Sequence, residues 1–275
     1  MQFGFVLPGG TASEQLELAM LAEDAGWDGL FVFESNYGVD PWTLLAAIAQ
    51  RTRRIRLGTM LTPLPWRRPW KLASQVATLD QLSNGRAILA VGLGAVDAEL
   101  GSTGEETDRR TRAERLDEGI DLIRGLWNGR MHFAGRHYNV QMEVRQDFAV
   151  ACKPVQERIP IWVVGAWPRA RSMQRVLRCD GLLPNVESTE GFGRATPDDV
   201  RAMRAWLVEH GATRPDFDIV SEGETPTDDA SAAAEQVRPF AEASSTWWLE
   251  TRWMTSASER LAEVRARLEA GPPRV

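Results

Sequence analysis

Apolar runs alternate with segments of helical periodicity along the whole chain. The runs are typical of strands whose two faces are both covered. In the segments between them, apolar side chains recur every three or four positions, as on one face of a helix. The predicted strands lie at residues 2–7, 28–33, 54–59, 86–94, 159–165, 180–186, 217–223 and 245–250, and the predicted helices at 11–26, 40–52, 69–85, 109–129, 168–179, 196–211, 231–243 and 256–271.

Capping residues support the boundaries of the first two helices. Asp40 stands directly before Pro41, which is typical of an N-cap followed by the first helical turn. Ser13 is a candidate cap for the first helix, and Gly26 is positioned to end it.

Eight strand–helix units in 275 residues predict a TIM (β/α)8 barrel. A doubly wound α/β sheet is the alternative. The stretch 130–158 interrupts the alternation, and Gly135 with its flanking aromatic residues indicates a hairpin there. We interpret this stretch as an insertion before the fifth strand of a single barrel domain, residues 1–275. The functional site is then expected where the strands end.

The segment NGRAILAVGLGA, residues 84–95, ends an apolar run with Gly-x-Gly. A dinucleotide-binding fingerprint requires a third glycine three residues further on, where a helix packs closely on the strand. Asp97 stands at that position, and the residues around it are polar and broken by glycines. A dinucleotide site is therefore excluded. The two glycines, Gly92 and Gly94, let a ligand approach the backbone at the end of a buried strand.

Composition and charge argue against several classes of protein. A net charge of −6, with no basic cluster beyond the arginines of residues 51–56 at a helix end, argues against nucleic-acid binding. No apolar run approaches the length of a membrane span, and no signal peptide is recognisable. Cys152 and Cys179 lie in unrelated contexts and indicate a reducing compartment. We expect a cytoplasmic protein that does not bind membranes.

Several motifs follow one another in a fixed order between residues 57 and 94: LGT, TP, an Arg-x-Pro helix start, QVATLDQLSNGR and VGLG. RLDEGIDLIRGLWNG, HFAGRHYNV, PVQERIPIWVVGAWP and DGLLPN come later. With these motifs the sequence resembles the luciferase-like monooxygenase family, which includes reduced-flavin and deazaflavin-dependent oxidoreductases. The resemblance covers most of residues 1–186, and the rest of the chain matches only in outline.

The resemblance implies a flavin-type ring at the strand ends. Gly92 and Gly94 then form the surface on which the ring rests, where a side chain would collide with it; the alternative is that they only end the strand. Thr59 and Met60 end the third strand, where relatives often have a backbone bulge, sometimes with a non-proline cis peptide, against the ring.

The cofactor phosphate is expected after the fifth strand. In VVGAWPRAR, Pro168 is predicted near the first position of a helix, whose free N–H groups and dipole attract a phosphate. By position in the family, the phosphate site comprises Gly165, Ala166, Trp167 and Arg169. Arg169 could add a charge-assisted contact, or could be a solvated helix arginine. Asn185, after the sixth strand, matches a position that often helps to bind the phosphate or ribityl chain.

The sequence departs from the family at two positions. Ser35 follows Glu34 where many relatives carry a histidine, and Ala95 stands where some deazaflavin-dependent dehydrogenases place an acid. Glu34 is the candidate catalytic acid or base, and the alternative is a structural carboxylate paired with backbone N–H groups or an arginine. Trp42 and Trp66 are predicted to cover an apolar substrate. The three histidines have no metal-ligand spacing, so no metal site is predicted.

The leading hypothesis is an oxidoreductase or monooxygenase that uses reduced FMN and oxygen on a small, apolar organic substrate. The alternative cofactor is the deazaflavin coenzyme F420, which would make the protein a hydride-transfer reductase. A non-catalytic flavin-binding protein and a metal-dependent barrel hydrolase are the other hypotheses. A homodimer is expected from the family, and a separate flavin reductase could supply reduced FMN.

Overall fold

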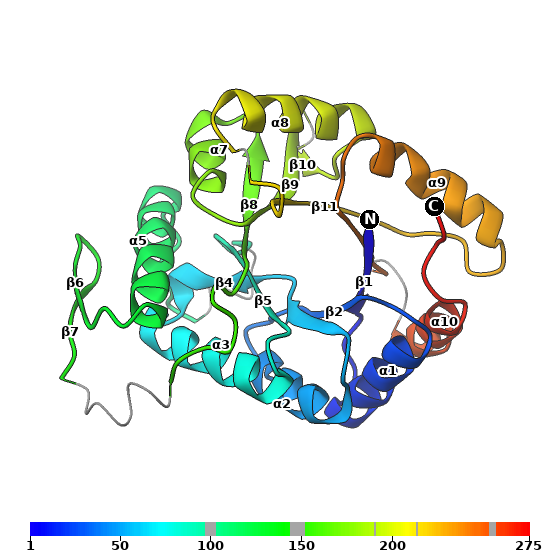
Figure 1. Ribbon diagram of the computed structural model, residues 1–275, viewed down its shortest axis with the longest axis horizontal. Coiled ribbons are helices and arrows are strands. Elements are labelled where there is room, and N and C mark those ends of the chain that lie inside the picture. Colours follow the sequence, from blue (N-terminus) through cyan, green and yellow to red (C-terminus); the bar gives the residue numbers. More distant parts are fainter. Residues whose placement is uncertain (97–102, 144–151, 190, 213, 253–256) are drawn as a thin grey trace.

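In a computed structural model of the chain, eight parallel strands form a closed barrel inside a ring of helices (Figure 1). Each strand pairs in parallel with the next, and the last pairs with the first, placing Gln2 opposite Trp247. The strands are β1 (Gln2–Leu7), β2 (Gly29–Val32), β3 (Arg56–Thr59), β5 (Ala87–Gly92), β8 (Ile161–Trp167), β9 (Gly181–Ser188), β11 (Asp218–Gly223) and β12 (Trp247–Glu250). The TIM barrel prediction is confirmed, because the pairing of β12 with β1 closes the sheet, whereas an open doubly wound sheet has two free edges.

The structure describes residues 1–96, 103–143, 152–189, 191–212, 214–252 and 257–275, without the side chains of 257–260. One helix follows each barrel strand, as predicted. These helices are α1 (Ala12–Asp24), α2 (Pro41–Arg51), α3 (Pro69–Ser83), α5 (Arg109–Trp127), α7 (Ala170–Val176), α8 (Pro197–Glu209), α9 (Ala230–Glu242) and α10 (Ala257–Glu269).

The helix caps follow the sequence with one correction. The Oδ1 atom of Asp40 accepts a hydrogen bond from the N–H of Thr43 at 2.8 Å, as an N-cap should. The N-cap of α1 is Thr11, which forms a capping box with Glu14. Ser13, the predicted cap, therefore lies inside the first turn. Thr11 prevails because a Glu follows it at the spacing that a capping box requires.

The predicted insertion contains a hairpin outside the ring of helices (Figure 1). Its strands, β6 (His132–Ala134) and β7 (Asn139–Gln141), pair in antiparallel fashion. The carboxylate of Glu118 on α5 accepts hydrogen bonds from the N–H groups of Arg136, His137 and Tyr138, at 2.8 to 3.0 Å. These three bonds attach the hairpin to α5. Residues 144–151 of the insertion lie outside the described part of the chain.

Aromatic side chains fill the interior of the barrel. Phe31 stacks on Trp162 with 5.3 Å between ring centroids, and Trp247 meets Trp162 edge-on at 5.3 Å. Ile88 and Ala90 join this cluster, whereas Leu89 and Val91 face the helices. The barrel is therefore packed, and a ligand can bind only at one of its two ends.

Two buried charged groups at the amino ends of the strands, Asp180 and Arg86, help to hold the barrel together. Asp180 accepts hydrogen bonds from Arg124, Arg158, Arg214 and the N–H of Ile161, at 2.5 to 3.0 Å. The buried guanidinium of Arg86 donates five hydrogen bonds through all three of its nitrogens. This end of the barrel is occupied by the protein's own contacts.

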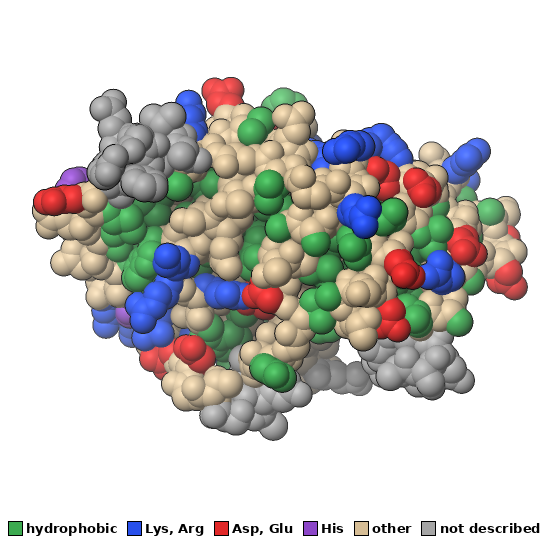
Figure 2. Space-filling model, turned by 90° about the horizontal axis from the view of Figure 1, so that it is seen from below, with side chains coloured by type: hydrophobic (Ala, Val, Ile, Leu, Met, Phe, Trp, Pro, Cys, Tyr) green, Lys and Arg blue, Asp and Glu red, His purple; other side chains and the backbone are tan. Residues whose placement is uncertain are grey.

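The described helices and one face of the molecule bear on the predictions about membrane and nucleic-acid partners. None of the described helices is long and apolar enough to span a membrane. On the face shown in Figure 2, basic and acidic side chains are interspersed among hydrophobic ones. That face therefore carries no uniform field of one sign.

Candidate active site

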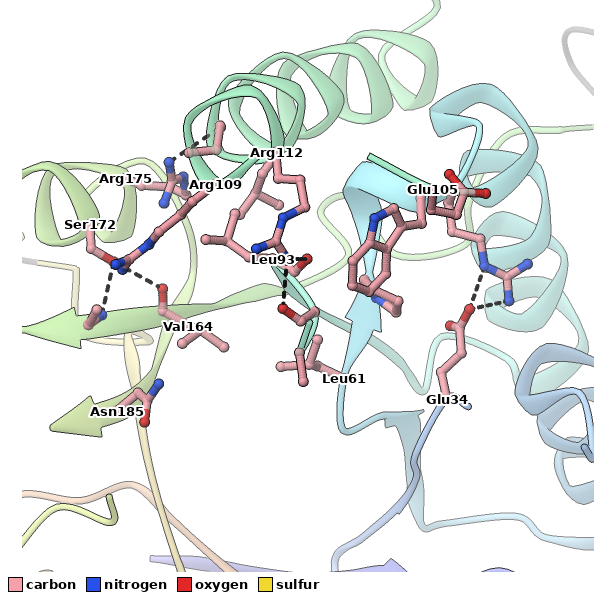
Figure 3. A pocket seen from close by; sticks show the side chains of 18 of the residues that line it. Glu34, Leu61, Leu93, Glu105, Arg109, Arg112, Val164, Ser172, Arg175 and Asn185 are labelled. Carbon is pink, nitrogen blue, oxygen red and sulfur yellow. Dashed lines mark hydrogen bonds and ion pairs between the residues drawn. The ribbon is translucent and has the colours of Figure 1, made fainter. Parts of the chain in front are cut away.

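A cavity of about 2250 Å³ opens at the carboxyl ends of the strands, as expected for a TIM barrel. Its floor is formed by Met60, Leu61 and Val164, which pack on the aromatic cluster inside the barrel. Trp66 and the start of α5 form its walls, and the cavity extends outward between α5 and α7 (Figure 3). We call this cavity the cleft. It has room for a tricyclic cofactor together with a small substrate.

The chain at the end of β3 forms the floor of the cleft. The hydroxyl of Thr59 is buried, bonds the hydroxyl of Thr62 at 3.0 Å and donates to the carbonyl of Ala90 at 3.3 Å. The peptide bond between Met60 and Leu61 is cis. A short strand, β4 (Thr62–Pro63), then pairs with β5. Met60 lines the cleft as predicted, and Thr59 supports it from below.

The glycines at the end of β5 lie against protein side chains. A Cβ atom at Gly92 would stand 3.0 Å from Leu61 and 3.1 Å from Val164. Gly94 has a positive φ of 78°, and a Cβ atom there would overlap the indole of Trp66. Trp66 thus fills the space above Gly94 that the sequence hypothesis reserved for a ring. The role of both glycines in cofactor binding stays a prediction, and the protein itself already requires Gly94.

Glu34 follows β2, lines the cleft and forms an ion pair with Arg67, which also lines it (Figure 3). Nε of Arg67 donates to Oε1 of Glu34 at 2.5 Å, and only 7% of the carboxylate side chain is exposed. Oε2 is buried and accepts no hydrogen bond of normal geometry from a described residue. Burial raises the pKa of Glu34, while Arg67 and the hydroxyl of Thr62 act to lower it. The carboxyl group can therefore hold a proton more readily than an exposed glutamate.

Arg112, on the first turn of α5, is a site residue that the sequence analysis missed. Its side chain reaches into the cleft, and Nη1 donates to the carbonyls of Leu93 and Gly94 at 3.1 and 2.9 Å (Figure 3). The guanidinium carbon lies 5.4 Å from the centre of the Trp66 ring. The sequence pattern did not single it out, because an arginine near the start of an amphipathic helix is usually solvated.

The predicted phosphate region has a different local structure from the one expected. The peptide bond between Trp167 and Pro168 is cis, and α7 begins only at Ala170 after an N-cap at Arg169. Pro168 is therefore outside the helix rather than in its first turn. The N–H of Ala166 donates to the hydroxyl of Ser172 at 2.9 Å. This contact places a hydroxyl at the start of α7, where the N-cap Arg169 provides no side-chain acceptor for the first N–H groups of the helix.

Gly165 and Arg169 serve the fold in this structure. A Cβ atom at Gly165 would overlap Leu182 and crowd Val176, so the glycine permits close packing of α7 on the sheet. Nε of Arg169 donates to Glu187 at 2.7 Å, and its guanidinium covers the ring of Phe192. The charge of Arg169 is thus balanced locally. Arg109 instead extends from α5 toward Ser172 (Figure 3) and forms no ion pair with a described residue.

The remaining predicted residues divide between cleft and core. Asn185 lies opposite Ala166 on β9, and both line the cleft. Trp66 lines the cleft and donates from Nε1 to the carbonyl of Glu106 at 3.0 Å. Trp42 is only 4% exposed and packs in the core between barrel and helices. The prediction that Trp42 covers the substrate is therefore wrong, because its place on α2 turns it inward.

No group of three or more His, Cys, Asp or Glu side chains could hold a metal ion among the described residues. His137 bonds Glu114 at 2.9 Å, and His210 stacks on Trp206. His137 thus contacts a carboxylate that lines the outer cleft, whereas His210 packs on α8.

Comparison with known proteins places the chain beside one family. The sequence profile of that family, described as Luciferase-like monooxygenase, matches residues 1–273. The chain is 32% identical over 239 residues to a Mycobacterium tuberculosis protein provisionally named a coenzyme F420-dependent oxidoreductase; the match covers 82% of this chain and 65% of that one. It is 34% identical over 164 residues to the F420-dependent glucose-6-phosphate dehydrogenase of Amycolatopsis mediterranei, covering 56% and 47%. The matches thus span less than two thirds of the length of these relatives.

A solved structure has the same fold. The monooxygenase RslO1 of Streptomyces bottropensis superimposes with a TM-score of 0.72 at 22% identity, covering 98% of each chain. At this identity the match supports the barrel fold alone.

The contact between Gly94 and Trp66 generates a prediction about stability. Gly94→Ala should lower the free energy of unfolding by about 2 kcal/mol, because the methyl group both overlaps Trp66 and occupies a left-handed backbone position. Gly129→Ala is the matched control, since Gly129 also has a φ of 78° but has no atom within 4 Å of the place that its methyl group would take. Denaturant unfolding of both variants separates the two causes. Equal losses would show that Trp66 does not constrain Gly94.

Proposed function

Because this chain belongs to the luciferase-like monooxygenase family, we propose that it is a deazaflavin-dependent oxidoreductase that uses coenzyme F420. The observation that carries the proposal is the arginine-lined part of the cleft between α5 and α7. Coenzyme F420 carries carboxylates beyond its phosphate, whereas FMN ends at the phosphate. The names of the relatives from Mycobacterium tuberculosis and Amycolatopsis mediterranei support the same cofactor.

The residues of the cleft fit a planar, anionic cofactor. Met60, Leu61 and Val164 offer an apolar surface for a conjugated ring. Ser172 and Arg109 would hold the phosphate near the end of β8, in place of the predicted Arg169. Arg171 lines the outer cleft without an ion pair to a described residue, and would meet the carboxylates of the side chain. Asn185 stays the predicted contact of the ribityl chain.

Bound there, the coenzyme would supply or accept a hydride. A substrate reduced in this way must also receive a proton, and Oε2 of Glu34 is the buried atom of the cleft that can hold one. Arg67 fixes the orientation of the carboxyl group through Oε1. Trp66 and the floor exclude water from the same region. We therefore assign Glu34 as the proton donor and Trp66 as a wall of the substrate site.

Reduced FMN with oxygen, the leading sequence hypothesis, is the second candidate. The family includes monooxygenases, and the chain is 37% identical over 130 residues to a 4-hydroxyprotoasukamycin monooxygenase, covering 44% of this chain and 34% of that one. Only this candidate requires a separate flavin reductase. The expected homodimer is compatible with either cofactor.

Binding affinities for the two cofactors can be compared directly. Oxidised coenzyme F420 should bind at least about tenfold more tightly than FMN, a difference of roughly 1.4 kcal/mol. Arg171→Gln should weaken binding of coenzyme F420 alone, because FMN has no carboxylate to meet it, whereas Arg109→Gln should weaken both. Fluorescence titration or ultrafiltration gives the affinities.

The control for these titrations is Arg51→Gln. It removes the same charge at an exposed position, the last residue of α2. Tighter binding of FMN would instead support the monooxygenase. Binding of either cofactor without turnover of any of a range of aldehydes, alkanes and enones would support a non-catalytic flavin-binding protein.

The role of Glu34 predicts a pH dependence. Burial raises the pKa of this carboxyl group, so the rate of substrate reduction should fall as the pH rises through that pKa. Arg67→Gln removes a charge that lowers the pKa and should move the fall to higher pH. Glu34→Gln should reduce kcat by about 100-fold and abolish this part of the profile.

Oxidation of the reduced coenzyme by enones, aldehydes or quinones measures these rates. Arg68→Gln, at the exposed neighbouring arginine, should leave the profile unchanged. A profile that Glu34→Gln does not alter would contradict the assignment.

A further inference from the structure

Arg112 has an unusual environment for a buried arginine. It is only 6% exposed and lines the cleft. Nη1 is held by the carbonyls of Leu93 and Gly94, and the flat face of the guanidinium lies near Trp66. Trp66 is itself fixed by its hydrogen bond to the carbonyl of Glu106. The orientation of the cation is therefore set before any ligand binds.

Among the described residues, acceptors occupy only one of the three guanidinium nitrogens of Arg112. Nε is buried without an acceptor, and Nη2 donates to no described residue. Burial lowers the pKa of Arg112, and Asp108 and Glu106 act in the opposite direction without forming an ion pair with it. A guanidinium nevertheless remains charged in proteins. The cleft thus contains a desolvated positive charge that lacks a counter-anion in the described residues, which is costly unless a ligand provides one.

Arg86 shows what a purely structural buried arginine looks like in this protein. Its guanidinium donates to five acceptors at the closed end of the barrel, and none of its nitrogens lacks a partner. Arg112 uses a single nitrogen, for two carbonyls that a neutral donor could also satisfy. The contrast indicates that Arg112 is placed to meet a negatively charged group inside the cleft.

We propose that Arg112 binds the anionic form of the cofactor ring and so favours that form over the neutral one. The inference rests on the proposed function, because it takes the ring to lie on the floor formed by Leu61 and Val164. The 8-hydroxy-5-deazaflavin ring loses its hydroxyl proton to give a delocalised anion, and a reduced flavin ring is also an anion near neutral pH. In this role Arg112 contacts the cofactor ring, whereas Ser172 and Arg109 contact the phosphate.

The ionisation of the bound ring tests the inference without any substrate. The absorbance of oxidised coenzyme F420 reports whether its ring hydroxyl is ionised, so the protein–coenzyme complex can be titrated with pH. Ionisation should require a pH about one unit higher in Arg112→Gln than in the wild type. Arg112→Lys keeps the charge and should lie closer to the wild type. Arg51→Gln removes an exposed arginine outside the cleft and should cause no shift.

The outcomes separate a charge effect from a structural one. If Arg112 only holds Leu93 and Gly94 in place, Arg112→Gln weakens binding of both ring forms equally and leaves the ionisation unchanged, which overturns the inference. An equal shift in Arg51→Gln also overturns it. If the protein binds FMN instead, the cofactor proposal fails, and the inference then requires Arg112→Gln to weaken reduced FMN about tenfold more than oxidised FMN. Binding of neither cofactor rejects both.

Discussion

The packed interior of the barrel determines where this protein can act. Phe31, Trp162 and Trp247 occupy the space inside the closed sheet, so no ligand can enter between the strands. Contacts among Asp180, Arg86 and their partners occupy the amino end of the strands. The carboxyl end alone remains open, and the residues of the β2, β3, β5 and β8 ends meet there around one cleft.

Glu34 and Arg112, in the cleft, differ from Arg86 and Asp180 at the amino ends of the strands in how many of their polar atoms have partners. At the closed end every polar atom of Arg86 has a partner, and several arginines surround Asp180. In the cleft, Oε2 of Glu34 and Nε of Arg112 have no partner among the described residues, although both are buried. A buried polar atom without a hydrogen-bond partner lowers the stability of the fold. Such atoms are typical of functional sites, where a bound ligand or a proton satisfies them. Arg56, at the amino end of β3, also has a buried Nε without a partner, but only the atoms of Glu34 and Arg112 belong to residues that line the cleft, where they support a polar, conjugated ligand.

The sequence was sufficient for the barrel and for the location of the site, because periodicity and strand ends are local properties. It also indicated Glu34 and Trp66 correctly as residues of the cleft. It failed where a side chain's direction depends on distant elements. Trp42 turns into the core. Arg169 lines the cleft but pairs with Glu187, and Gly165 packs against Leu182, so their roles in phosphate binding stay predictions. Arg109 and Arg112 reach the cleft from α5, and no local pattern distinguishes them from solvated helix arginines.

The central claim is that the cleft holds an anionic deazaflavin whose ring lies on the floor beside Arg112 and whose phosphate lies at Ser172. A crystal structure of the protein with coenzyme F420 tests it most directly. We expect the ring against Leu61 and Val164, with the Arg112 guanidinium in contact with it and the phosphate within hydrogen-bond distance of Ser172 or Arg109. A phosphate held by Arg169 after rupture of its pair with Glu187, or a ring remote from Arg112, would rule out this binding mode.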